Sequence, residues 1–198
     1  MKNNLLTFLI FFLFLSLYGC SLKKKNREIA NKNESSNHMN LKDTLSTIEG
    51  LSNYVLKLKF DQIENDRLLI RKFKIRRGRM EDEGVEWSDY EFIYNSKISI
   101  TVENNWQDSS RVSRISFLDG QFQTEDKVAV NSPFSDIRNQ VDSGRLNESP
   151  DGLLTFHISR MKNISFNIDV SKNKELFYGI KNIRQVPDSL LITSIVIK

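Results

Sequence analysis

The sequence has only one cysteine, Cys20, and two histidines, His38 and His157, among its 198 residues. A single cysteine excludes an intramolecular disulfide and a zinc site made of several thiolates. The two histidines lie far apart in the chain and do not form a metal-ligand pattern. The folded part must therefore be stabilised by its hydrophobic core.

Motifs of well-known enzyme classes are also absent. The chain has no Gly-x-x-x-x-Gly-Lys-Ser/Thr loop, no glycine-rich dinucleotide fingerprint and no Gly-x-Ser-x-Gly elbow. Carboxylate pairs such as Asp61 and Glu64 are expected by chance in a chain with this many charges. We therefore predict no catalytic residue, no metal ligand and no cofactor, and we interpret His157 as an outward polar residue of a strand.

No apolar run reaches the roughly 20 residues that a membrane-spanning helix needs. The longest run, Leu5 to Leu17, has 13 residues and follows a short basic start. Such a start, a short apolar run and a small residue before the cut are typical of a secretory signal. Leu17-Tyr18-Gly19-Cys20 resembles a bacterial lipobox, although Tyr18 is bulkier than the residue usual at that position.

The lipobox resemblance implies that residues 1–19 are a signal peptide and that Cys20 begins the mature chain, carrying acyl chains. Two or more chains hold a protein firmly at a membrane, whereas one binds only marginally. The alternatives are a secreted protein cut after Gly19 and an uncleaved anchor with an unmodified Cys20. Ser21 is not the acidic retention signal known in enteric bacteria, which favours the outer membrane, facing the periplasm.

Residues 20–40 are expected to be the lipidated cysteine and a flexible basic tether. Ser21 to Asn40 has no aromatic residue and buries too little apolar surface to offset the entropy of ordering. A flexible coil of about 20 residues spans roughly 25 Å. Its basic residues beside the anchor are expected to contact an anionic surface, with a solvated linker as the alternative: Lys23, Lys24, Lys25 and Arg27.

Residues 41–198 are expected to form a single globular domain of α+β class, mostly antiparallel β, with sandwich-like sheets. Apolar spacing predicts a short helix over 41–53, and short alternating segments predict strands over 54–60, 68–75, 90–94, 97–102, 111–118, 153–159, 164–170 and 191–197. The last strand is apolar on both faces, which predicts a central position in a sheet.

Residues 76–89 are dense in charge and contain two glycines, so we expect a long hairpin loop there. Its basic residues (Arg76, Arg77, Arg79) adjoin its acidic ones (Glu81, Asp82, Glu83), and such charges usually pair locally in solvent. A phosphate-binding arginine cluster is the alternative. We expect Trp87 to cover the core rather than to contact a ligand.

The principal helix is expected near residues 133–141. Ser132 can accept a hydrogen bond from the first turn, and Pro133 at the first helical position loses only an amide that has no partner. Phe134, Ile137 and Val141 then share one face. Capping explains these residues without an anion site.

Four segments of the second half resemble a family of small enterobacterial envelope lipoproteins of the sigma-E stress regulon: Ser113-Arg114-Ile115 leading to Asp119, Val128 to Asp136, Ile164 to Phe166, and Ser194 to Ile197. The resemblance covers roughly Ser113 to Lys198. It implies an envelope location and a mostly β fold, and it implies no activity. Asn131 stands where the family has glycine, and the family's paired cysteines are absent here.

The net charge of +4 is too small to suggest nucleic acid. We expect a membrane-anchored envelope lipoprotein that binds an envelope protein or an anionic envelope component without catalysis. The alternative is an envelope glycan or peptide hydrolase that uses carboxylates. Two carboxylates converging in a pocket, one of them with a perturbed pKa, would favour that alternative.

Overall fold

The computed structural model describes residues 45–141, 147–148, 152–158, 160–161, 163–172, 178–180 and 182–198. Leu45–Lys198 forms a compact unit, and Met1–Thr44 falls in a separate one. The predicted signal peptide, Cys20 and the tether therefore lie outside the described residues. Within the part that the structure describes, no helix has the length and apolar character of a membrane span.

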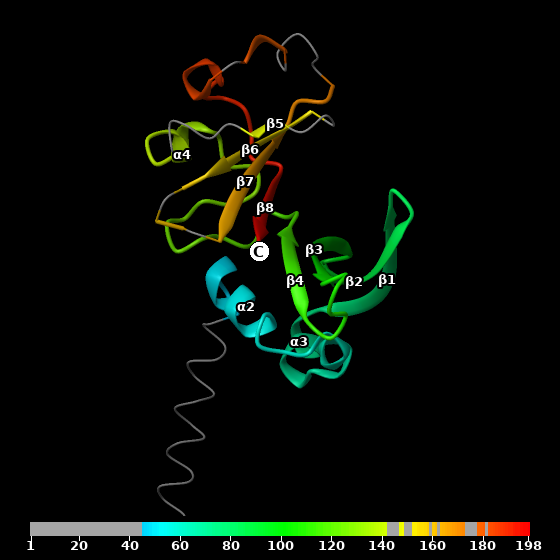
Figure 1. Ribbon diagram of the computed structural model, residues 1–198. Helices are drawn as coiled ribbons and strands as arrows, with labels where there is room; N and C mark the ends of the chain where they lie inside the picture. The colour runs from blue at the N-terminus through cyan, green and yellow to red at the C-terminus, as the bar shows by residue number, and fades with distance from the viewer. Residues whose placement is uncertain are drawn as a thin grey trace, which may run out of the picture. The chain divides into compact units, whose positions relative to one another are not determined.

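Eight strands form one antiparallel sheet in the order β1-β2-β3-β4-β8-β7-β6-β5 (Figure 1). The C-terminal strand β8 pairs with β4 on one side and with β7 on the other, so its predicted central position is confirmed. The strands are β1 (Lys74–Asp82), β2 (Val85–Tyr94), β3 (Lys97–Asn104), β4 (Val112–Phe117), β5 (Asn147–Glu148), β6 (Leu153–His157), β7 (Ile164–Asp169) and β8 (Ser194–Ile197).

One apolar row crosses six neighbouring strands of this sheet, from β2 to β6. Its members are aligned by the strand register and are fully buried: Phe92, Ile100, Phe117, Ile195, Phe166 and Phe156. Because successive side chains alternate between the faces of a sheet, a slip of one residue would turn a strand's member of this row to the opposite face. The row therefore fixes the register.

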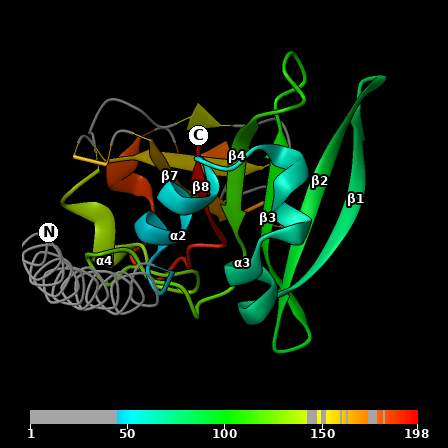
Figure 2. The ribbon, with the colours of Figure 1, turned by 90° about the horizontal axis from the view of Figure 1, so that it is seen from below.

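Three short helical segments cover the face of the sheet that carries this row (Figure 2). They are α2 (Ile48–Val55), η1 (Phe60–Asn65) and α3 (Arg67–Lys72). Phe60 packs on Tyr90 with ring centroids 4.6 Å apart, and Phe73, just after α3, packs on Phe92 at 5.1 Å. The aromatic residues of the first half thus join the helices to β2.

Asp66 links α2 to α3. Its side chain caps α3 by accepting hydrogen bonds from the amides of Leu68 and Leu69, each 3.0 Å long. Its second oxygen accepts a 2.8 Å hydrogen bond from the hydroxyl of Tyr54 in α2. Burial, followed by this hydrogen bond, raises the pKa of Tyr54 to about 12.

The predicted class, α+β and mostly antiparallel β, is confirmed. The described strands form one continuous sheet where sandwich-like sheets were expected, because β4 pairs with β3 and with β8. The helix predicted over 41–53 corresponds to α2. The strands predicted over 54–60 and 68–75 are wrong, because these segments hold the end of α2 and most of α3. Over so few residues, alternation of apolar and polar side chains does not distinguish a strand from a capped helical turn.

The predicted principal helix is a single turn, α4 (Ser135–Arg138), and α2 is the longest helix among the described residues. Ser132 does not cap α4, because its hydroxyl accepts a 3.0 Å hydrogen bond from the amide of Ala129. Phe134 and Ile137 are fully buried, as their shared face predicted. Asn131 has φ 71°, a left-handed conformation that asparagine tolerates. The remaining short helix, η2, spans Ile183–Gln185.

Candidate functional site

The β1–β2 hairpin extends beyond the end of β3. β1 and β2 pair along their whole length, from Lys74 opposite Ile93 to Asp82 opposite Val85, whereas β2 pairs with β3 only from Asp89 onward. Residues 79–88 therefore form a projecting end of the hairpin. Glu83 and Gly84 make its tight turn, both with positive φ.

The long loop predicted over residues 76–89 is therefore wrong, since the strands continue to a two-residue turn. Most side chains near the tip are exposed on both faces of the hairpin. Such strands lack the alternation of apolar and polar residues that marks a half-buried strand. For this reason the charged segment 76–89 predicted a loop.

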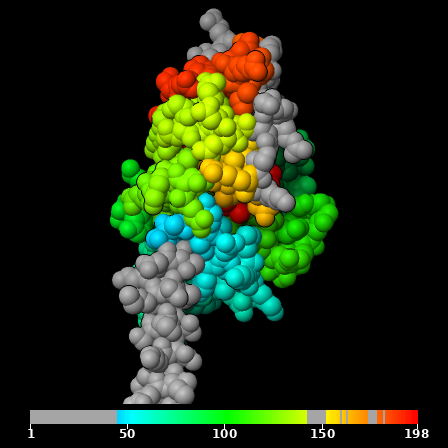
Figure 3. All heavy atoms as spheres, turned by 90° about the vertical axis from the view of Figure 1, so that its left-hand side faces the viewer, coloured from blue at the N-terminus to red at the C-terminus, as the bar shows by residue number. Residues whose placement is uncertain are grey.

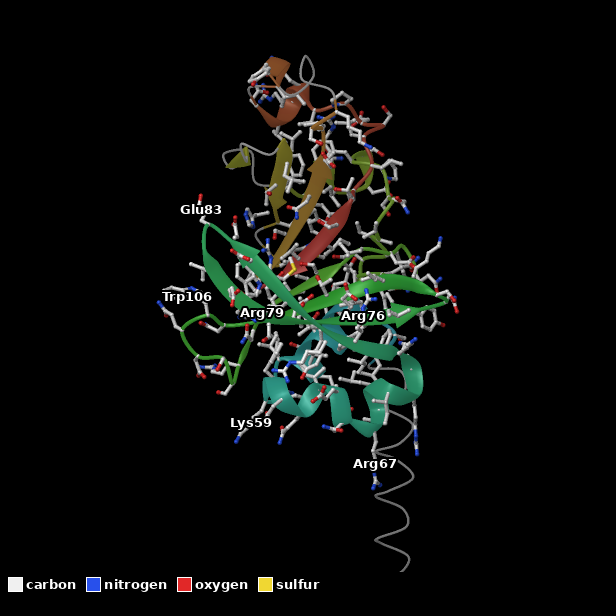
Figure 4. All side chains as sticks on the ribbon, turned by 90° about the vertical axis from the view of Figure 1, so that its right-hand side faces the viewer. Lys59, Arg67, Arg76, Arg79, Glu83 and Trp106 are labelled. Atoms are coloured by element: carbon white, nitrogen blue, oxygen red, sulfur yellow. The ribbon has the colours of Figure 1, made fainter. Side chains whose placement is uncertain are left out.

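Asn104, at the end of β3, joins the projecting end to the β3–β4 loop. Its side-chain oxygen accepts a 3.1 Å hydrogen bond from the amide of Ser88, and its side-chain nitrogen donates a 3.5 Å bond to the carbonyl of Ser109. Within the loop, Asn105 accepts a 2.8 Å bond from the amide of Gln107. This network holds Trp106, which is 71% exposed, beside the hairpin (Figure 4).

The acidic cleft is a cavity of about 370 Å³ between the projecting end and the β3–β4 loop. Its walls combine two indole rings, three carboxylates and three smaller side chains: Trp87, Trp106, Asp82, Glu83, Glu103, Val85, Asn104 and Ser113. These are the only two tryptophans in the sequence.

A second cavity, the arginine-side cleft, has a volume of about 410 Å³ and shares Trp87, Asn104 and Trp106 with the acidic cleft. Arg77, Arg79 and Glu86 supply its charged lining. The two tryptophans therefore border two hollows of different charge.

The acidic cleft has no basic residue in its lining. The nearest ion pair joins Glu103 to Arg114 at 3.8 Å, and Asp82 and Glu83 form no ion pair among the described residues. Carboxylates and aromatic faces both attract cations. The indole nitrogen of Trp87 is buried and has no hydrogen-bond partner among the described residues.

The arginines of β1 are already engaged. Arg76 pairs with Glu91, Arg79 pairs with Glu86, and the guanidinium of Arg77 lies 5.7 Å from the ring centre of Tyr90. Local pairing of opposite charges was expected, but the acidic partners come from β2 instead of Glu81, Asp82 and Glu83. The strand register explains the difference, because it sets Arg76 opposite Glu91.

Asp89 is the most deeply buried carboxylate near these clefts, at 4% exposure. Burial raises its pKa, the charge of Glu91 adds to this, and Arg76 opposes it. The Asp89 side chain packs against the Cα atom of Gly78. A Cβ atom at position 78 would lie 2.3 Å from the Asp89 Oδ1 atom. Glu103 is its register partner on β3, but Asp89 lines neither cleft.

A third cavity, of about 380 Å³, is lined by residues of α2, of the segment around Glu125 and of the β6–β7 turn. The face of the molecule that carries these segments is drawn in Figure 3. Both carboxylate oxygens of Glu49 accept a hydrogen bond from the amide of Glu125, and Asp126 pairs with Arg160 at 2.8 Å. Burial raises the pKa of Glu49. No group of three or more His, Cys, Asp or Glu side chains among the described residues could hold a metal ion.

The predicted site residues and His38 lie outside the described residues: Cys20, Lys23, Lys24, Lys25 and Arg27. His157 ends β6 opposite Ser165 and lines none of the three cavities. Trp87, expected to cover the core, lines both clefts instead. Trp106 was not predicted, and its only signal was a lone tryptophan in the polar segment 103–110.

The chain thus belongs to the α+β proteins built on one antiparallel sheet. Among solved structures it is similar to the uncharacterized protein yfeY from Escherichia coli, with a TM-score of 0.54 and 14% identity over 73% of this chain and 95% of that chain. At this identity the likeness shows the fold alone. No protein-family model matches the chain, and no curated protein does.

This neighbour is an uncharacterized protein of an enteric bacterium. It is consistent with the resemblance to an uncharacterised enteric family. Regulation by sigma-E is not tested by the comparisons and stays a prediction.

Proposed function

We propose that this chain is a lipid-anchored protein of the bacterial cell envelope whose domain binds a partner without catalysing a reaction. In this proposal residues 1–19 are removed, Cys20 carries the lipid, and the domain faces the periplasm from the outer membrane. The acidic cleft is the binding site. The observation that carries the proposal is that both tryptophans of the chain line this cleft together with three carboxylates and no basic residue.

The chemistry of the acidic cleft fits a cationic segment of an envelope protein. A Lys or Arg side chain over an indole ring gains about 0.5–1 kcal/mol at an exposed site. Asp82 and Glu83, which form no ion pair among the described residues, add favourable charge pairs from the hairpin, and Glu103, which already pairs with Arg114, adds negative charge from β3. Tryptophan is also enriched among the residues that dominate protein interfaces.

A carboxylate hydrolase is the second candidate. Asp89 has a raised pKa and is the register partner of Glu103, which lines the acidic cleft. However, Asp89 is 4% exposed and lies beneath Gly78, so a substrate in the cleft has no access to it. We therefore favour binding over catalysis.

Intrinsic fluorescence tests the binding site directly, because Trp87 and Trp106 are the only tryptophans. We expect oligolysine to change their emission and oligoglutamate to leave it unchanged. The triple variant Asp82→Asn/Glu83→Gln/Glu103→Gln should bind oligolysine at least about tenfold more weakly, since each exposed charge pair contributes up to about 1 kcal/mol.

The matched control removes three exposed carboxylates elsewhere: Asp61→Asn/Glu64→Gln/Glu125→Gln. It should bind oligolysine as the wild type does. Equal weakening in both variants, or no response to oligolysine in the wild type, would refute the cationic ligand.

Intact-mass analysis of membrane-extracted protein tests the anchor. The wild-type chain should begin at Cys20 and carry added acyl mass, and Cys20→Ala should abolish both the processing and the added mass. An unmodified wild-type chain would refute lipid anchoring and leave the cleft proposal standing.

A further inference from the structure

The folded domain has a basic face of its own, although its total charge is balanced. Residues 45–198 contain 22 Lys and Arg and 22 Asp and Glu, so the net charge of +4 comes from residues 1–44. Within the domain, residues 56–74 contain six basic and three acidic residues. Positive charge is therefore concentrated around η1 and α3.

Helix α3 presents part of this charge on one side. Arg67, Ile70 and Arg71 stand at positions i, i+3 and i+4, which share a helix face, while Leu69 is fully buried against the core. Ile70 is 50% exposed despite being apolar. Lys59, just before η1, points the same way as Arg67, away from the sheet (Figure 4).

We call Lys57, Lys59, Arg67, Ile70 and Arg71 the basic helix face. All five side chains are exposed, and none of its four basic residues forms an ion pair among the described residues. The arginines of β1 differ, because Arg76 and Arg79 are paired with β2.

The three acidic residues of segment 56–74 offset only half of its six basic charges. Asp61 and Glu64 are exposed on η1 and form no ion pair among the described residues. The third, Asp66, is engaged in capping α3 and in the hydrogen bond from Tyr54.

The same helix is tied to the start of the domain. The Lys72 ammonium donates a hydrogen bond to the carbonyl of Leu45, the first described residue, and lies 5.1 Å from the ring centre of Phe122. Leu45, where the compact unit begins, is therefore held beside α3. If Cys20 carries the lipid, the 25 residues from Cys20 to Thr44 span at most about 85 Å, which keeps the domain within reach of the membrane surface.

We propose that the basic helix face docks on an anionic lipid surface, with Ile70 inserted among the headgroups. Basic residues attract anionic lipid, and an exposed apolar side chain between them gains by leaving water. Glu83 points away from Lys59 and Arg67, so docking leaves the tip of the hairpin directed elsewhere (Figure 4). The domain would then have a membrane contact separate from the acyl chains and from the tether.

Vesicle co-sedimentation tests this contact. The protein is residues 20–198 with Cys20→Ser, which retains the whole compact unit and cannot be acylated. We expect binding to phosphatidylglycerol-containing vesicles, weaker binding at higher salt, and no binding to phosphatidylcholine alone. The variant Lys57→Gln/Lys59→Gln/Arg67→Gln/Arg71→Gln should bind at least about tenfold more weakly.

Two further variants make the result specific. One removes four exposed basic residues from other parts of the domain, Lys97→Gln/Lys127→Gln/Lys172→Gln/Arg184→Gln, and should bind nearly as the wild type does. The other neutralises Lys23, Lys24, Lys25 and Arg27. The proposal would be overturned if binding depended only on these four tether residues. It would also be overturned if the basic helix face variant and the control variant lost binding equally. Circular dichroism verifies that each variant is folded. Neither result bears on the acidic cleft or on acylation of Cys20.

Discussion

The middle of the sheet and the projecting end of the hairpin share strand β2 but differ in burial and in strand pairing. In the middle, Phe92 is fully buried in the apolar row, and β2 pairs with β1 and β3. At the projecting end, β2 pairs with β1 alone, and Val85 is 48% exposed. The core packing of β2 and its lining of the acidic cleft thus lie in separate parts of the strand, so substitutions should separate stability from the proposed binding.

The largest effect on stability is expected from Phe117→Ala. Phe117 lies in the middle of the apolar row, is fully buried, and packs 5.9 Å from the ring centre of Phe122. Truncation leaves a cavity, which should lower the free energy of unfolding by about 3–5 kcal/mol. Urea denaturation followed by circular dichroism measures it. A loss below 1 kcal/mol would show that the row does not hold the sheet together.

The same contrast explains what could be predicted from the sequence. The strands predicted over 97–102, 111–118 and 164–170 lie in nearly the observed places, because apolar and polar residues alternate along most of each segment. Asn95 and Ser96, which separate the strands predicted over 90–94 and 97–102, form a turn in which both residues have positive φ. By contrast, helix α3 depends on a cap from Asp66, and a local pattern of apolar residues does not reveal that cap.

The candidate site was largely beyond prediction. Its carboxylates come from separate segments, Asp82 and Glu83 from the hairpin tip and Glu103 from β3, which the pairing of β2 with β3 and the hydrogen bonds of Asn104 bring together. Trp106 stands in a polar connection with no periodicity to mark it. Sequence reasoning supplied the likeness to a lipobox at Cys20, which falls outside the described residues.

Gly78→Ala should have the next largest effect and marks the border between the two regions. The added Cβ would lie 2.3 Å from the Asp89 Oδ1 atom, so β1 or the buried carboxylate must move. Such overpacking costs about 1–3 kcal/mol of unfolding free energy. Thermal unfolding of Gly78→Ala, Asp89→Ala and the double variant tests the cause. Fully additive losses would mean that the clash with Asp89 is not responsible.

Asp89→Asn is expected to stabilise the protein by about 1 kcal/mol at neutral pH, because the ionised side chain is buried with one oxygen lacking a partner. Burial raises the pKa of Asp89 in the folded state. Ionisation of Asp89 therefore begins to lower the unfolding free energy as pH rises above the ordinary pKa of 3.8, and this loss is complete above the raised pKa. The advantage of the variant should therefore vanish at low pH. Urea midpoints across pH measure it, and a constant advantage would contradict the titration argument.

Trp106→Ala is expected to change stability least and binding most. The ring is 71% exposed, and the hydrogen bonds that order its loop come from Asn104 and Asn105, so the unfolding free energy should stay within about 0.5 kcal/mol of the wild type. The response of the remaining Trp87 to oligolysine should nevertheless be lost, because one aromatic wall of the acidic cleft is gone. Fluorescence titration and urea denaturation of the same sample measure both. Unchanged oligolysine binding would separate the exposed tryptophan from the proposed site, whereas a large loss of stability would make the projecting end part of the core.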